Sequence, residues 1–154
     1  MVKVYVVYDT KYGNTKLVAE KIVEGMKEVR EIETVVVNVG EANPENVTDY
    51  DAILIGSPNH YGGPTKGIRE FIDELGQLSL DGKFVVFFDT YLGKGFFEKA
   101  VKRMERSTNE RVPGLKQMAP GLSIRVDGTK GPVADGELSK CSEFGQRIAN
   151  QLKT

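Results

Sequence analysis

Apolar residues along this chain follow two alternating spacings, which predict strands followed by helices. Short runs of β-branched and aromatic residues are typical of strands buried on both faces. Apolar residues three or four positions apart are typical of helices with one buried face. The runs predict strands at residues 2–8, 34–39, 51–56, 83–89 and 122–126. The helical spacing predicts helices at 15–28, 68–75, 96–104 and around 144–152.

Strands that alternate with helices indicate an α/β fold with a parallel sheet. Right-handed crossovers then place helices on both faces of the sheet. We therefore expect one domain over residues 1–154, a three-layer sandwich whose five-stranded parallel sheet has the order 2-1-3-4-5. Residues 107–120, which include Pro113 and Pro120, are expected to form a long loop.

The predicted strand order indicates where a ligand binds. Ligands of such sheets lie beyond the carboxyl ends of the strands, at the point where the strand order reverses. That point lies here between the first and third strands. The loops that follow the first, third and fourth predicted strands are therefore the candidates for a binding site.

The first of these loops, "DTKYGNT" at residues 9–15, has the chemistry of an anion site. Thr10, Tyr12, Asn14 and Thr15 offer hydrogen-bond donors, and Gly13 permits close approach of the backbone. The loop opens into a helix, whose amino end favours negative charge. The alternative is that Asn14 or Thr15 merely caps the helix. Capping requires one such side chain, so the abundance of donors favours a phosphate.

The other two loops carry aromatic residues beside glycines. The stretch "GSPNHYGGP" at residues 56–64 presents His60 and Tyr61, and residues 89–95 present Tyr91 between Thr90 and Gly93. Together with an anion site, two such loops indicate a pocket for a flat ring that carries a phosphate. Riboflavin phosphate, FMN, meets this description.

These stretches resemble motifs of the flavodoxin family. The first loop resembles the phosphate motif Ser/Thr-x-Thr-Gly-x-Thr, although Tyr12 stands where many members have threonine and Lys11 adds a charge. "GSPNHYGG" resembles the second flavin loop, and "CSEFGQRIA" resembles the closing helix.

The resemblance implies non-covalent FMN and an electron carrier that requires no catalytic residue and no metal. Gly62 would belong to a flexible peptide whose carbonyl accepts a hydrogen bond from the reduced ring, and His60, Tyr61 or Tyr91 would cover the ring. The cofactor-binding residues that it implies are Thr10, Lys11, Tyr12, Gly13, Asn14, Thr15, Pro58, Asn59, His60, Tyr61, Gly62, Thr90, Tyr91, Leu92 and Gly93.

An enzyme on the same fold is the alternative. The second loop also resembles loops of NAD(P)H:quinone oxidoreductases and of the flavin domain of flavodiiron proteins. A histidine beside a flavin can protonate a quinone, and His60 occupies a suitable place in the sequence.

Composition and charge limit the kinds of partner that we expect this chain to bind. The longest apolar runs are of strand size, and a lone Cys141 suits a reducing cytosol, so we expect a cytoplasmic monomer that binds neither membrane nor nucleic acid. The net charge of −1 combines −6 over residues 1–90 with +5 over residues 91–130. We expect redox proteins as partners, attracted by a local acidic patch of Glu70, Asp73 and Glu74 if they are basic.

Overall fold

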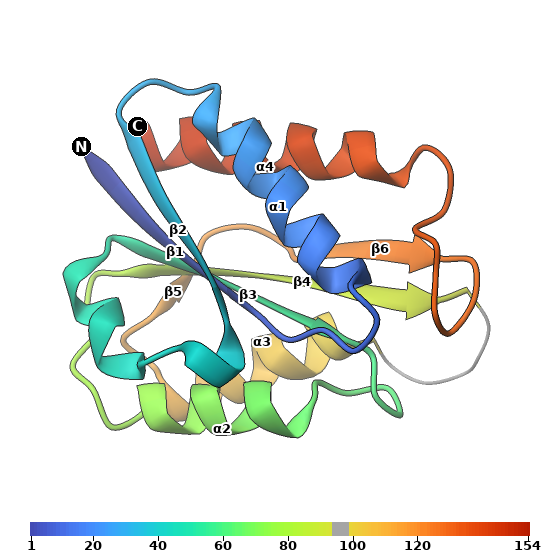
Figure 1. The fold of residues 1–154 in the computed structure, drawn as a ribbon. Coiled ribbons are helices and arrows are strands. Elements are labelled where there is room, and N and C mark those ends of the chain that lie inside the picture. Colours follow the sequence, from blue (N-terminus) through green and yellow to red (C-terminus); the bar gives the residue numbers. More distant parts are fainter. Residues whose placement is uncertain (94–98) are drawn as a thin grey trace.

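The computed structural model describes residues 1–93 and 99–154. Its fold is a three-layer α/β sandwich around a parallel sheet (Figure 1). The strands are β1 (Val2–Tyr8), β2 (Ile32–Asn38), β3 (Ala52–Pro58), β4 (Phe84–Leu92), β5 (Lys116–Gln117) and β6 (Leu122–Val126). The helices are α1 (Asn14–Lys27), α2 (Lys66–Leu75), α3 (Ala100–Arg111) and α4 (Glu137–Lys153), with 3-10 turns η1 (Val39–Glu41) and η2 (Pro44–Asp49).

The sheet confirms the predicted order 2-1-3-4-5. Its strands run β2-β1-β3-β4, and both β5 and β6 pair with β4. The two pair at different levels, since β5 lies beside Phe84 and Val85 whereas β6 lies beside Phe88 to Leu92. The predicted fifth strand is thus divided into two pieces, and the described part of the sheet has six strands instead of five.

Helix α3 and strand β4 both end later than predicted. Helix α3 continues to Arg111, so residues 107–111 are helical and not part of a loop. Its last turn buries Thr108, which carries no apolar signal in the sequence. Strand β4 extends through Thr90, Tyr91 and Leu92 because β6 pairs with these residues, which we had expected in a loop. The predicted helical positions 96–98 lie outside the described residues.

Alternating side chains of the central strands build a core on each side of the sheet. Val4 and Val6 of β1 pack with α1 and α4, whereas Tyr5 and Val7 pack with α2 and α3. Figure 1 shows the same layers, with α1 and α4 above the sheet and α2 and α3 below it. The described helices contain no segment long and apolar enough to cross a membrane.

Glycines bring α1 and α4 into close contact. A methyl group on Gly145 of α4 would overlap the carbonyl of Ile22, and one on Gly25 of α1 would overlap the carbonyl of Ser142. Each glycine therefore lies directly against the backbone of the other helix. Gly145 therefore serves the packing of α4 against α1.

We predict that Gly145→Ala lowers the free energy of unfolding by about 1–3 kcal/mol, because the helices must separate to admit the methyl group. Urea unfolding of the apoprotein measures this change. Gly40→Ala is the matched control, since its nearest neighbour would lie at 3.4 Å, an ordinary contact. Equal stabilities of the two variants would contradict the prediction.

Candidate functional site

A cavity of about 470 Å³ lies at the carboxyl ends of β1, β3 and β4. The strand order predicted a binding site here, because β2 and β3 lie on opposite sides of β1. The cavity is lined by Thr10, Lys11, Tyr12, Asn14, Thr15, Pro58, Asn59, Tyr61, Gly62, Thr90, Tyr91, Leu92, Gly93, Lys99, Val126 and Thr129. Every predicted site residue except Gly13 and His60 is therefore in its lining.

The first loop presents the amino end of α1 to this cavity. Gly13 precedes the helix with a φ of 93°, a conformation that suits glycine. Its N–H donates to Thr10 Oγ1 at 2.9 Å, and the first helical hydrogen bond runs from Leu17 N to Gly13 O at 3.0 Å. Gly13 thus shapes the loop while its neighbours face the cavity.

No side chain among the described residues caps α1. The backbone N–H groups of Asn14, Thr15 and Lys16 have no carbonyl within the helix to bond. Capping by Asn14 or Thr15, the alternative raised from the sequence, does not occur. Instead the Thr15 hydroxyl forms a buried hydrogen bond of 2.9 Å with that of Thr90. The amino end of α1 is therefore available to an anion.

The second loop is a tight hairpin at the cavity rim. His60 N donates to Gly63 O at 2.8 Å, and Gly63 N donates to His60 O at 3.1 Å. The two residues between them have positive φ, 53° at Tyr61 and 78° at Gly62. That pattern is a type I′ turn, which is uncommon for a residue as large as tyrosine. The turn holds the Tyr61 ring outward, with 82% of the residue exposed.

His60 lies beside the cavity without lining it. Its imidazole is exposed and meets the Tyr61 ring edge-on, with the ring centroids 4.9 Å apart. Its backbone closes the hairpin described above. The residue therefore orders the loop, and its side chain supports Tyr61.

Asp9 joins the first loop to the second, a role that the sequence did not reveal. One carboxylate oxygen accepts from Thr10 N at 2.8 Å, and the other accepts from Thr65 Oγ1 at 2.5 Å. The Thr65 hydroxyl in turn accepts from Ile68 N, so it also caps α2. The strand end, both loops and a helix start are thus connected through one aspartate.

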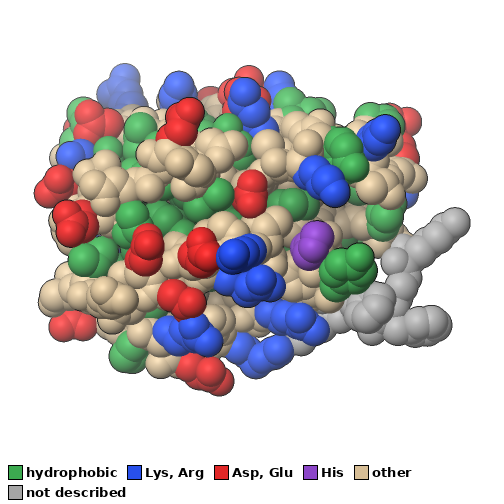
Figure 2. All heavy atoms as spheres, turned by 60° about the horizontal axis from the view of Figure 1, so that its bottom comes forward, with side chains coloured by type: hydrophobic (Ala, Val, Ile, Leu, Met, Phe, Trp, Pro, Cys, Tyr) green, Lys and Arg blue, Asp and Glu red, His purple; other side chains and the backbone are tan. Residues whose placement is uncertain are grey.

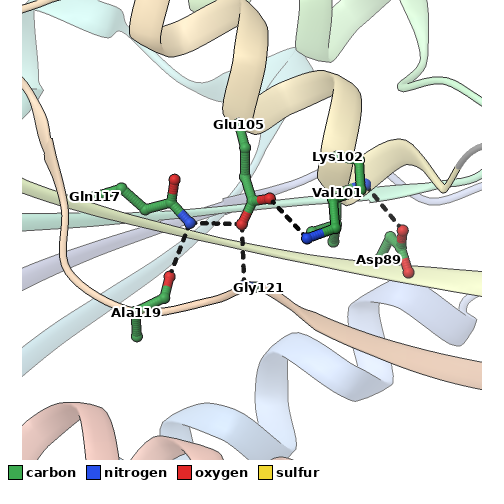
Figure 3. Close-up of polar contacts among 7 residues, drawn as sticks. All are labelled: Asp89, Val101, Lys102, Glu105, Gln117, Ala119 and Gly121. Carbon is green, nitrogen blue, oxygen red and sulfur yellow. Dashed lines mark hydrogen bonds and ion pairs between the residues drawn. The ribbon is translucent and has the colours of Figure 1, made fainter.

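Asn59 joins the second loop to β4 and α3. Its backbone N and its Nδ2 each donate to Thr90 O at 3.0 Å, and its Oδ1 accepts from Ala100 N at 2.7 Å. Asp89, fully buried, accepts from Val101 N at 3.0 Å. Figure 3 shows this bond, and also Glu105 farther along α3, which accepts from Gly121 N. The amino end of α3 is capped by side chains from other elements.

Burial raises the pKa of the Asp89 carboxyl, although the hydrogen bond from Val101 N opposes this effect. The folded protein therefore holds the Asp89 proton to a higher pH than the unfolded chain does. The stability that protonated Asp89 contributes is complete below the pKa that this carboxyl has in the unfolded chain, about 4. It is lost as the pH rises through the higher pKa that the carboxyl has in the folded protein.

Three lining residues were missed from the sequence. Lys99 falls within the predicted helix 96–104 and outside the three expected loops, but its Nζ lies 4.1 Å from the centroid of the Tyr91 ring. Val126 ends β6 and Thr129 follows it, and the loop after this strand was not among those expected to bind. The sequence did contain a signal for this loop, because it also begins at the carboxyl end of a predicted strand.

The donors in the lining suit a phosphate group. Helix amides and hydroxyls gather at one end, and the charged residues of the described lining are Lys11 and Lys99, without a carboxylate. Lys11 and Lys130 also lie near the Tyr12 ring, 5.5 and 5.9 Å from its centroid. Tyr61 and Tyr91, with Gly62 and Gly93, line the cavity from the second and third loops. The residues present therefore fit a flat ring with a phosphate tail.

Fold and site together define a doubly wound α/β protein with a ring-and-phosphate pocket at its switch point. Comparison with known families agrees, since the flavodoxin domain model matches residues 5–124. The chain belongs to the flavodoxin domain family. FMN is the cofactor of that family.

Individual relatives cover different parts of the chain. It is 38% identical over 98 residues to a flavodoxin of Aquifex aeolicus, an alignment of 62% of this chain and 53% of the relative. The chain thus spans about half the length of that relative. It is 24% identical over 159 aligned positions to a flavodoxin of Clostridium saccharobutylicum, covering 98% of each. A solved flavodoxin from the domain Archaea superposes with a TM-score of 0.84 at 27% identity, covering 99% of this chain and 100% of that one.

We predict that Asp89→Asn changes how stability depends on pH. As the pH rises above about 4, the wild-type free energy of unfolding should fall relative to that of the variant, because only the wild type must ionise a buried carboxyl. Urea unfolding of the apoproteins at several pH values measures the difference. The exposed Asp49→Asn provides the control. A difference between wild type and Asp89→Asn that is constant with pH would contradict this account.

Proposed function

We propose that residues 1–154 form one FMN-binding domain that carries electrons between redox proteins. The observation that carries this proposal is the uncapped amino end of α1, which opens into a cavity lined by donors and aromatic side chains. Bound FMN supplies the redox chemistry, since it accepts and releases electrons one or two at a time. The protein residues bind it, orient it and set its surroundings.

Residues of the first loop would hold the phosphate. The three free amides of the first turn of α1 and the side chains of Thr10, Asn14 and Thr15 supply donors, and Lys11 supplies charge. The bond between Thr15 and Thr90 fixes this end of the pocket to β4. Hydrogen bonds that backbone amides donate to charged phosphate oxygens are stronger than those between neutral groups.

The second and third loops would frame the ring. Tyr61 and Tyr91 are the candidates to lie against its faces, and Pro58, Asn59, Leu92 and Gly93 complete the frame. Gly62, at the centre of the turn, would present its peptide to the edge of the ring. Positive φ at Tyr61 and Gly62 supports this role, because strained backbone persists where the surroundings hold it in place.

The position of His60 favours a carrier over a quinone reductase. A proton donor for a bound quinone must reach the pocket, but His60 lies outside the lining and contacts Tyr61 instead. We further propose a monomer in the cytoplasm, a location that the buried, unpaired Cys141 supports.

The experiment that tests this proposal compares two ligands. Apoprotein is titrated with FMN and with riboflavin, and flavin fluorescence reports binding. Several charge-assisted hydrogen bonds to the phosphate should make FMN bind about a hundredfold more tightly. Equal affinities, or no binding of FMN, would overturn the proposal.

Two variants separate the ends of the pocket. Asn14→Ala removes a hydrogen-bond donor to the phosphate. It should therefore weaken FMN binding about fivefold and leave riboflavin binding unchanged. Tyr61→Asn removes a ring contact, so it should weaken both ligands equally, and asparagine tolerates the positive φ of the turn. If both variants weakened FMN and riboflavin in the same proportion, the assignment of the two ends would be wrong.

A further inference from the structure

Cationic side chains gather where α2 and α3 begin, beside the loops of the pocket. We call this surface the basic face. It consists of Lys66, Arg69, Lys99, Lys102, Arg103 and Arg106, all of them exposed. The positions recur three and four apart, so they form one outward stripe on each helix. In Figure 2 lysine and arginine side chains lie next to the single histidine of the chain.

Several of these cations are held against the pocket loops. Arg69 donates to Pro64 O at 3.5 Å. The Arg103 side chain covers Gly63, since a methyl group there would lie 3.0 Å from its Nη1. Lys99 stands over Tyr91 within the cavity lining. The basic face is therefore continuous with the frame proposed for the ring.

Negative charge on these helices lies farther from the pocket or is partly covered. Glu70 faces Lys66 at 3.8 Å, and Asp73 pairs with Arg111 at the far end of α3. Glu105 lies 3.6 Å from Lys102, but its side chain is only 12% exposed (Figure 3). Glu70 and Asp73 of the acidic patch expected from the sequence are thus matched by cations, and the charged residues of the described cavity lining, Lys11 and Lys99, are positive.

The rim of the pocket is apolar where it meets this face. Tyr61 is 82% exposed and Leu92 is 44% exposed. An apolar centre with a charged border is the usual composition of a protein interface. The net charge of only −1 gives the chain little overall attraction, so local charge decides the approach of a partner.

We infer that the basic face docks an electron-transfer protein whose surface is acidic around its own redox centre. This inference rests on the proposed function. Lys66, Lys102 and their neighbours attract the acidic surface during approach, and Tyr61 and Leu92 lie at the contact. Charges at the border of an interface chiefly change the association rate and its dependence on salt.

The first test uses small oxidants of opposite charge. Reduced holoprotein is mixed with ferricyanide, a trianion, or with tris(ethylenediamine)cobalt(III), a trication. Each metal ion accepts one electron from the reduced FMN and passes from its trivalent to its divalent state. Between about 0.01 M and about 0.5 M ionic strength, the ferricyanide rate constant should fall about threefold or more, while the cobalt rate constant should not fall. The opposite pattern, or equal slopes, would overturn the inference.

Charge reversal locates the effect. Lys66→Glu and Lys102→Glu should each lower the ferricyanide rate constant about twofold at low salt and leave it unchanged at high salt. Both changes place an acid near a helix amino end, where it is favourable for folding. Lys116→Glu is the matched control, since this exposed lysine lies on β5 beside the start of β4, at the other end of the sheet. An equal effect of Lys116→Glu would show a general charge effect and contradict the inference.

A second test does not depend on the cofactor. A decaglutamate peptide is added to ¹⁵N-labelled apoprotein at low salt, and the amide resonances of α2 and α3 are followed. We expect resonance shifts at the first turns of both helices. We expect these shifts to be lost in Lys66→Glu and Lys102→Glu. Tighter binding of a thymidine decanucleotide at the same residues would point to nucleic acid and overturn the assignment. Failure of the apoprotein to bind FMN would refute the proposed function. It would not decide whether the basic face binds an acidic surface, because the peptide experiment tests that binding separately.

Discussion

The backbone amides at the start of α1 are the groups around which the site is arranged. Helix geometry leaves the N–H groups of Asn14, Thr15 and Lys16 without internal partners, and no described side chain takes the place of a cap. The parallel order of β2, β1 and β3 brings this helix end to the point where the sheet divides. Hydroxyls and lysines then add donors and positive charge to a place where the fold already favours an anion.

The loops of the pocket are held together by polar side chains within its lining and behind it. Asp9 joins the first loop to the start of α2, and Asn59 joins the second loop to β4 and α3. Asp89 fixes the beginning of α3 from within the core. Most of these bonds end on backbone groups, so they set the course of the chain. Loops fixed in this way lose less conformational entropy when a ligand binds.

The sequence predicted those parts of the molecule that depend on local pattern. Apolar runs identified the strands, and the hydroxyl-rich turn around Gly13 pointed to a loop that the structure places at the cavity. Features that depend on contacts between distant segments escaped prediction. The extension of β4 through Thr90 requires pairing with β6, and the last turn of α3 buries Thr108, a polar residue. Lys99 looked like an ordinary surface lysine because only the packing of α3 brings it over Tyr91.

The most direct test of the central claim follows the amide resonances of Asn14, Thr15 and Lys16. ¹⁵N-labelled apoprotein is saturated in turn with FMN and with riboflavin, which present the same ring but differ in the phosphate. The account predicts large downfield proton shifts of these amides with FMN and small shifts with riboflavin, because only the phosphate accepts their hydrogen bonds. Equal shifts with both ligands would contradict it and would place the phosphate away from the start of α1.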